Sequence, residues 1–383
     1  MYVLLSSCAR KRYRDDILRC MAAPVGAEIQ FRYLKVLVGE SVKRDLNALS
    51  SARALVCNVD IDVKANESGV HPLIPVRSVT ILHAWSHGST ITVSLKMGDF
   101  AHAADLARFT NQVSQLSGGQ TPTNAASDAE SGGFWFFQIS DQPDTVRVKR
   151  DLETWELITS QLGSISHFKE EPFFWTVIGL RKGSADSIDD GDRIDSWPDT
   201  IDFDEVYTML IYVFSPKDVN WPKSIGQLIL KTDLQLTSAM APEIIVDSPY
   251  DLKRWPFKIK QPSLTFRDRS WLRIGQEGVR IDNLKTVEDR KDMSPEEINR
   301  ELRQALRGAM DWEIDLPLRF NFSWFRVFWV NLVVGSLLAA PAITVIWRQT
   351  ASSDGEKALT SLIALIFGIA ASLVATFQIR RVA

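Results

Sequence analysis

The sequence predicts an α+β protein in which a β-rich region is followed by a C-terminal hairpin of two membrane-spanning helices. Short runs of Val, Ile, Leu and aromatic residues, several alternating with polar residues, recur before residue 294, and such runs are typical of strands. Two charge-free apolar runs, residues 327–347 and 359–377, then close the chain. Each run is long enough to cross the hydrocarbon core of a bilayer.

The first expected module, residues 1–117, is β-rich. The residues Ser86, His87, Gly88 and Ser89 fit a hairpin turn between two of its strands. A helix is expected over residues 100–116, where apolar residues recur at spacings of three and four. The expected strands cover residues 2–5, 28–38, 54–63, 78–84 and 90–96.

A domain boundary is expected at residues 118–133, whose Gly, Ser, Thr, Asn and Ala content cannot build a core. This segment is a flexible linker or a long loop, so the cytoplasmic part contains one or two sandwich-like modules. The second module is expected over residues 134–293, with a helix at 152–162. Its expected strands cover residues 173–180, 207–214, 227–237, 255–260 and 270–281.

A connecting helix and a pre-membrane segment are expected over residues 294–323. Ser294 suits an N-cap, Pro295 suits the first helical position, and two glutamates follow in the first turn. We expect this helix to run to about Trp312. It would pass a shift in the β-rich region to the membrane spans.

The hairpin is expected over residues 324–383, with both chain termini in the cytoplasm of a bacterium. Arginines lie before the first span and after the second, whereas Arg348 and Lys357 are the only basic residues of the intervening loop. Positive charge is retained on the cytoplasmic side of a membrane. The sequence therefore predicts a two-pass protein of the bacterial inner membrane.

Small and polar residues fall at helix-packing spacing in both spans, and small faces let helix backbones approach closely. Two uses are open: packing of the two helices within one chain, or assembly of several copies around a conducting path. Two helices cannot enclose a conduit, so a channel would have to be an oligomer. The candidate pore or helix-packing residues are Asn331, Gly335, Ala339, Thr344, Ser361, Gly368 and Ser372.

A basic cluster near the N-terminus is the best candidate for a ligand site. Guanidinium groups directly after a strand suit phosphate, as in nucleotides or nucleic acid, and an interleaved tyrosine could stack on a base. Contact with anionic lipids and a solvated basic turn are the alternatives. The cluster consists of Arg10, Lys11, Arg12, Tyr13 and Arg14, with Arg19 and Arg32 nearby.

No catalytic motif is recognisable: the chain lacks GxSxG, HExxH and GxxxxGK[ST]. We therefore expect no enzymatic activity, no cofactor and no metal. An enzyme with an unfamiliar site, using His87 with the acidic stretch at residues 186–205, is a further alternative. The three cysteines, Cys8, Cys20 and Cys57, match no metal or disulfide pattern and are expected to be reduced.

A cytoplasmic β-rich region, a connecting helix and a two-span hairpin resemble the architecture of bacterial anti-phage defence membrane effectors, including the Hailong channel effectors. This resemblance implies an oligomeric effector, controlled by a ligand or partner, that permeabilises or depolarises the inner membrane. The partners it implies are the lipid bilayer, further copies of the chain, a nucleotide or oligonucleotide, and a protein encoded in the same operon. A membrane-anchored adaptor or sensor without a pore is the alternative.

Overall fold

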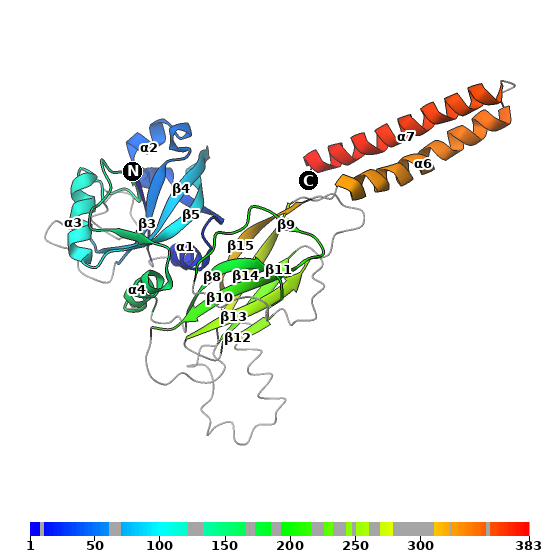
Figure 1. Cartoon of the computed structure of the whole chain (residues 1–383). Coiled ribbons are helices and arrows are strands. Elements are labelled where there is room, and N and C mark those ends of the chain that lie inside the picture. The colour runs from blue at the N-terminus through cyan, green and yellow to red at the C-terminus, as the bar shows by residue number, and fades with distance from the viewer. Residues whose placement is uncertain are drawn as a thin grey trace, which may run out of the picture.

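The computed structural model combines a β-rich body with a pair of long C-terminal helices, and is of the α+β class (Figure 1). The β-rich, α+β character predicted from the sequence is confirmed. The structure describes residues 1–7, 11–60, 70–121, 133–165, 168, 173–184, 193–216, 226–232, 243–246, 250–259, 269–278, 310–321, 324–349 and 353–382.

A mixed sheet forms the N-terminal part of the body, in the order β2-β5-β4-β3-β1-β6, with β7 added beside β5. Only β1 and β3 pair in parallel; the other neighbours are antiparallel. The sheet consists of β1 (Tyr2–Ser7), β2 (Glu28–Leu34), β3 (Arg53–Val59), β4 (Leu73–His87), β5 (Thr90–His102), β6 (Phe136–Gln138) and β7 (Arg147–Lys149).

Helices cover both faces of this sheet, because alternate strand residues are apolar on each side. α1 (Lys11–Ala22) lies over one face, whereas α3 (Leu106–Leu116) buries Phe109 and Val113 against the other. The helix predicted over 100–116 is wrong at its start, because Phe100, Ala101 and His102 pair with β7 as the end of β5. The smaller helices of this part are η1 (Lys35–Leu37), α2 (Glu40–Arg44) and η2 (Asn47–Leu49).

The predicted boundary at 118–133 does not separate two modules. β6 pairs with β1 and β7 pairs with β5, so the chain beyond residue 133 returns to the first sheet. α4 (Leu152–Gly163), predicted at 152–162, packs against β4 and β5. The Gly and Ser content of a segment does not determine whether strands before and after it pair with each other. The boundary predicted from composition was therefore wrong.

A sandwich of two sheets follows, antiparallel except for one short parallel pairing, and tryptophans lie where the two sheets face each other. Trp175 of β8 stacks on Trp312 of β15 with ring centroids 4.9 Å apart, and its indole N–H donates to the Gln276 side-chain oxygen at 2.8 Å. One sheet is β13-β10-β8, from β8 (Phe174–Lys182), β10 (Val206–Phe214) and β13 (Tyr250–Lys258). The other is β12-β11-β14-β15-β9, from β9 (Ile201–Asp202), β11 (Gly226–Thr232), β12 (Glu243–Val246), β14 (Arg269–Gly278) and β15 (Met310–Asn321).

β15 corrects the prediction of a helix and a pre-membrane segment over residues 294–323. Met310–Asn321 is a strand hydrogen-bonded to β14, and Trp312, Ile314, Leu316 and Leu318 alternate into the sandwich core. The predicted helix therefore does not reach Trp312; its residues 294–309 lie outside the described residues. Of the residues whose helical spacing predicted that helix, Ile298, Leu302, Leu306 and Met310, only Met310 lies in β15, so the periodicity gave no support for a helix beyond it.

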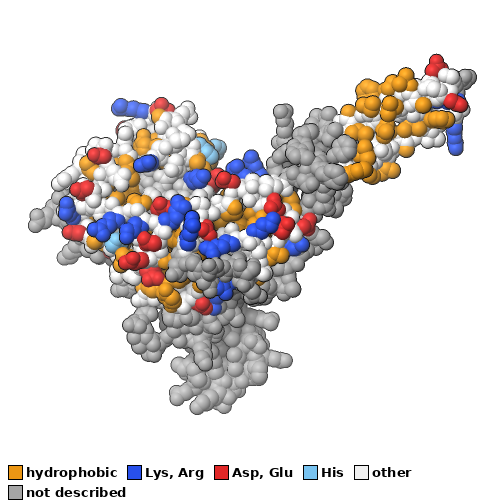
Figure 2. Space-filling view, in the orientation of Figure 1, with side chains coloured by type: hydrophobic (Ala, Val, Ile, Leu, Met, Phe, Trp, Pro, Cys, Tyr) orange, Lys and Arg blue, Asp and Glu red, His pale blue; other side chains and the backbone are white. Residues whose placement is uncertain are grey.

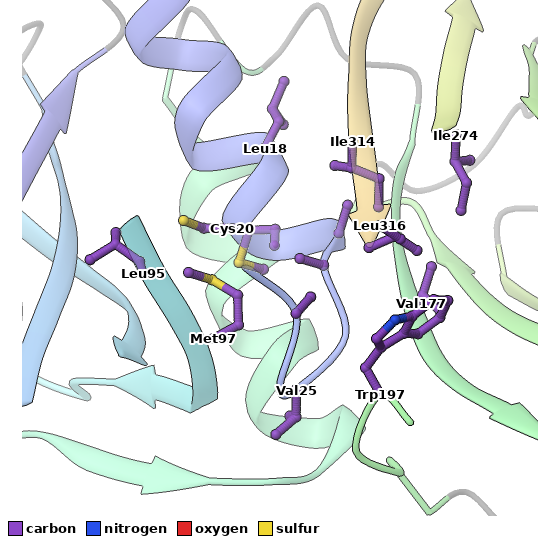
Figure 3. Close-up of a cluster of buried hydrophobic side chains, with 14 of the residues drawn as sticks. Leu18, Cys20, Val25, Leu95, Met97, Val177, Trp197, Ile274, Ile314 and Leu316 are labelled. Carbon is purple, nitrogen blue, oxygen red and sulfur yellow. The ribbon is translucent and has the colours of Figure 1, made fainter. Parts of the chain in front are cut away.

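One continuous apolar core joins the first sheet to the sandwich, and α1 lies at its centre (Figure 3). α1 contacts β1, β2 and β4 on one side and β8 and β15 on the other. Leu18 and Cys20 of α1 point into a cluster that includes Leu95 and Met97 of β5 and Ile314 and Leu316 of β15 (Figure 3). Because α1 packs against both the first sheet and the sandwich, a movement of α1 changes the packing of both.

The two predicted C-terminal helices are present as α6 (Trp324–Gln349) and α7 (Asp354–Val382). They pack along each other as a hairpin that extends away from the body (Figure 1). By length and hydropathy, none of the helices in the described part of the chain qualifies as a membrane-spanning segment.

Candidate functional site

The basic cluster predicted as a ligand site lies at the start of α1, which begins at Lys11. Tyr13 and Arg14, in the first turn, are half-buried. The Tyr13 ring stacks on Trp135 with centroids 6.1 Å apart, and Arg14 Nε lies 3.8 Å from Asp15 Oδ1. Arg10 and the side chains of Lys11 and Arg12 lie outside the described residues. One face of Tyr13 is thus used in packing and is not free to stack on a base.

The charge pattern of α1 runs against its helix dipole. The first turn contains Lys11, Arg12 and Arg14 and no acidic residue. Helix N-termini carry a partial positive charge and free N–H groups, so cations there are unfavourable and a bound anion is favourable. The first turn of α1 is therefore an electropositive position suited to an anion.

Asn58, which the sequence reasoning missed, lies beside this helix end. It is opposite Ser6 in the parallel pairing of β3 with β1, and the Ser6 hydroxyl donates to the Tyr13 carbonyl oxygen at 2.7 Å. Asn58 is fully buried, and among the residues that the structure describes neither its side-chain nitrogen nor its oxygen has a hydrogen-bond partner. An asparagine inside the apolar run ALVCNV was the available signal.

The other end of α1 is held by a buried arginine, Arg77 of β4. Its Nη1 donates to the carbonyl oxygens of Cys20 and Ala23, at 2.8 and 2.7 Å, and its Nε donates to Gly98 O at 2.9 Å. Its guanidinium lies 4.1 Å from the ring centroid of Phe100. Burial lowers the pKa of Arg77 to about 10. The side chain satisfies the last carbonyls of α1, so its role is structural.

A cleft of about 720 Å³ opens where the first sheet meets the sandwich. It brings together two arginines near the predicted cluster, Arg19 of α1 and Arg32 of β2. The four carboxylates of the cleft lie within 4.0 Å of arginines, whereas Arg32 has no ion-pair partner among the described residues. The lining residues are Asp16, Arg19, Glu28, Ile29, Gln30, Arg32, Ser94, Ser270, Trp271, Glu313, Ile314, Asp315 and Pro317.

Two side chains, one from α1 and one from the segment between β8 and β9, donate hydrogen bonds to the backbone of β15. Arg19 Nε donates to the Glu313 carbonyl oxygen at 2.9 Å, and Trp197 Nε1 donates to the Pro317 carbonyl oxygen at 2.8 Å. Within the described residues, β9 pairs with β15 only at Phe320 and Asn321. These two side chains therefore satisfy carbonyls on an edge of β15 that is otherwise largely unpaired.

The predicted pore or packing residues of the hairpin are mostly used between its own two helices. A side chain at Gly335 would come within 2.6 Å of Ile369, and one at Gly368 would overlap the Gly335 carbonyl. Ala339 and Ser372 are buried, and Ser361 accepts a hydrogen bond from Trp347 Nε1 at 3.0 Å. Thr344 is exposed and bonds to its own helix at Ala340 O, while the side chain of Asn331 lies outside the described residues.

Histidines, acids and cysteines form no second site in the part of the chain that the structure describes. Within that part, no three His, Cys, Asp or Glu side chains are arranged to hold a metal ion. His83 stacks on Trp85, and Asp195 and Asp202 of the acidic stretch pair with Arg181 and Lys182. Burial raises the pKa of the two thiols described, those of Cys20 and Cys57, so both stay protonated.

No protein-family model matches this chain, and neither a curated protein nor a solved structure matches it at a significant level.

Proposed function

We propose that this chain is an oligomeric effector of the bacterial inner membrane, controlled by a ligand or partner, that permeabilises or depolarises the membrane in anti-phage defence. In this proposal the β-rich body lies on the cytoplasmic side, the helices α6 and α7 enter the bilayer, and several copies assemble. The ligand is an anion, a nucleotide or an oligonucleotide, that binds at the basic first turn of α1.

The apolar surface of the hairpin supports membrane insertion. Leu337 is 68% exposed and Phe367 is 71% exposed, and apolar side chains cover much of the visible hairpin, whereas charged residues are interspersed over the body (Figure 2). Exposed apolar surface on this scale is costly in water and needs a cover. Trp329 and Trp347 lie near opposite ends of α6, as interfacial residues do. No charged residue occurs in either apolar run, residues 327–347 and 359–377.

The functional part of the proposal rests on the connection from α1 through β15 to the hairpin. Arg19 joins α1 to the backbone of β15. β15 ends at Asn321 and α6 begins at Trp324. Through this mechanical connection, a ligand that prefers one position of α1 can shift the balance between two states of the hairpin. Here β15 takes the role that the sequence reasoning gave to a helix at residues 294–312.

The alternative, an anchored adaptor or sensor without a pore, is favoured by one observation. Gly335 and Gly368 pack against each other's helix within one hairpin. The small residues are thus accounted for without a second copy of the chain. A tether needs no further function from them, whereas a pore needs additional contacts between hairpins.

The test is membrane potential, measured with a voltage-sensitive dye in bacteria that express the full chain. The comparison is a variant in which Arg10, Lys11, Arg12 and Arg14 are changed to Ala. We expect depolarisation by the full chain, altered in size by the variant, with both proteins in the membrane fraction. A normal potential throughout, including under phage challenge, would leave only the anchor. Recovery of the full chain from the soluble fraction would overturn both functions.

A further inference from the structure

The burial of the polar Asn58 side chain is not explained by its packing in the described part of the body. Asn58 is fully buried in a sheet, and both hydrogen-bonding atoms of its amide lack a partner in the described part of the chain. A buried amide without partners costs free energy, whereas an apolar residue of similar shape would not. A polar group retained at this cost points to a partner other than the residues that the structure describes.

The neighbours of Asn58 show where that partner would lie. Asn58 and Ser6 are opposite each other in the parallel pairing of β3 with β1, so their side chains project from the same face of the sheet. Ser6 reaches the first turn of α1 through the Tyr13 carbonyl. The Asn58 amide is therefore directed at the N-terminal end of α1, beyond the carboxyl ends of two parallel strands. Open α/β sheets bind ligands at such ends.

The local charges favour an anion. The first turn of α1 combines free N–H groups with Lys11, Arg12 and Arg14 and has no acidic residue. Asp60, which follows β3 on the same face as Asn58 and is 8% exposed, opposes an anion. Asp15, the next residue of α1, lies 3.8 Å from Arg14 Nε and offsets part of the positive charge as well. Lys11, Arg12 and the helix N-terminus leave the balance positive, which suits a single phosphate group better than a polyanion.

We propose that the ends of β1 and β3 and the first turn of α1 bind the phosphate group of a small phosphate ester, with Asn58 as the side chain that recognises it. The Asn58 nitrogen would donate to a phosphate oxygen. Its oxygen would accept from a hydroxyl or N–H of the same ligand, which is why we infer an ester that carries such a group, as nucleotides do, and not bare phosphate.

This inference deepens the proposed function, on which its regulatory meaning rests. Because the amide is fully buried, the phosphate can reach it only if the first turn of α1 moves, and the stacking of Tyr13 on Trp135 moves with it. α1 also holds β15 through Arg19. Binding would therefore displace the element that leads into the hairpin.

The experiment uses the full chain, purified in detergent, with AMP and inorganic phosphate as probes at constant ionic strength. Affinity is measured by equilibrium dialysis and stability by the unfolding temperature. Asn58→Leu should weaken AMP binding by roughly ten- to a hundredfold, the usual effect of losing hydrogen bonds to a charged group. The same variant should unfold at a higher temperature than the wild type without ligand. Asn47→Leu, at an exposed asparagine, is the matched control and should change neither.

A second measurement needs no variant: AMP should slow amide hydrogen exchange in the first turn of the wild-type α1. Binding of neither probe by the wild type, or equal binding by Asn58→Leu, would overturn the site and leave Asn58 as a partner of internal water. Binding of both probes with equal affinity would overturn the ester. A chain that depolarises membranes but binds neither probe loses only this inference. A chain that binds AMP without depolarising loses only the proposed function.

Discussion

Arg19 of α1 donates a hydrogen bond from Nε to the backbone oxygen of Glu313 in β15, 2.9 Å away and 294 positions along the chain. The guanidinium also lies 3.4 Å from Asp16 Oδ1, one turn earlier in α1. The side chain is thus oriented from its own helix and reaches the backbone of the strand that leads into α6. A contact to backbone does not depend on the Glu313 side chain, so only changes at Arg19 test it.

Replacing Arg19 with Met should uncouple the body from the hairpin. The methionine keeps the apolar contacts of the stem but leaves Glu313 O without its donor, which should lower the free energy of unfolding by about 1 kcal/mol, because the group is partly exposed. AMP binding should be unchanged, whereas depolarisation by the full chain should fall severalfold. Arg53→Met, at an exposed arginine of β3, is the control. Unchanged depolarisation by Arg19→Met would mean that this hydrogen bond transmits nothing.

Replacing Arg77 with Met should destabilise the body far more. The change removes three hydrogen bonds to buried carbonyls and leaves the end of α1 unsatisfied, for an expected loss of about 3–5 kcal/mol in urea unfolding. Arg77→Lys should not restore stability, because one ammonium cannot reproduce the planar spread of donors. A loss below 1 kcal/mol for Arg77→Met would contradict the capping role.

Replacing Gly368 with Leu should separate the two helices of the hairpin. Even a Cβ at this position overlaps the Gly335 carbonyl, and backbone cannot yield as a flexible side chain can. The readout is the distance between spin labels at two exposed positions, Leu337 and Phe367, after Cys8→Ser; the buried Cys20 and Cys57 thiols should not react. Gly355→Leu is the control, because a Cβ there meets no atom within 4 Å. An unchanged label distance would refute the close packing.

Depolarisation by Gly368→Leu distinguishes the two candidate functions. A pore built from these helices should lose activity while the protein stays in the membrane fraction. A tether should keep whatever activity its body has. The comparison is informative only alongside the label distance, which shows whether the helices have separated.

Acid should weaken the end of β15 next to the hairpin. A hydrogen bond from Asn321 and another from Lys182 lower the pKa of Asp202 below its ordinary value of 3.8. The ionised carboxylate therefore contributes stability that is complete above that value and is lost as pH falls through the lower, folded-state pKa. Asp202 is 43% exposed, so solvent screening keeps the effect small. Asp202→Asn should show a shallower loss of stability below about pH 4, and an equally steep loss would contradict this.

Strand and helix positions could largely be predicted from local pattern. β8, β10 and α4 begin and end within two residues of their predicted bounds, because short apolar runs and their spacing are local signals. The errors arose where pairing is non-local. β15 was mistaken for the end of a helix and a pre-membrane segment, and the boundary at 118–133 overlooked that β6 returns to β1. Which strand pairs with which is decided by the core, not by neighbouring residues.

For the candidate site too, some features could be predicted from local sequence and others depended on contacts between distant residues. By itself the sequence determined the class, the two charge-free runs and the basic cluster after the first strand, because composition and short-range periodicity are properties of the chain alone; the helix α1 was not predicted. Only the tertiary structure decided that α1 lies between sheet and sandwich, that Arg19 holds β15, and that Asn58 is buried beside Ser6 with no partner among the described residues. The physical reason is that burial and hydrogen-bond satisfaction depend on residues far away in the chain, which come together only when the core closes.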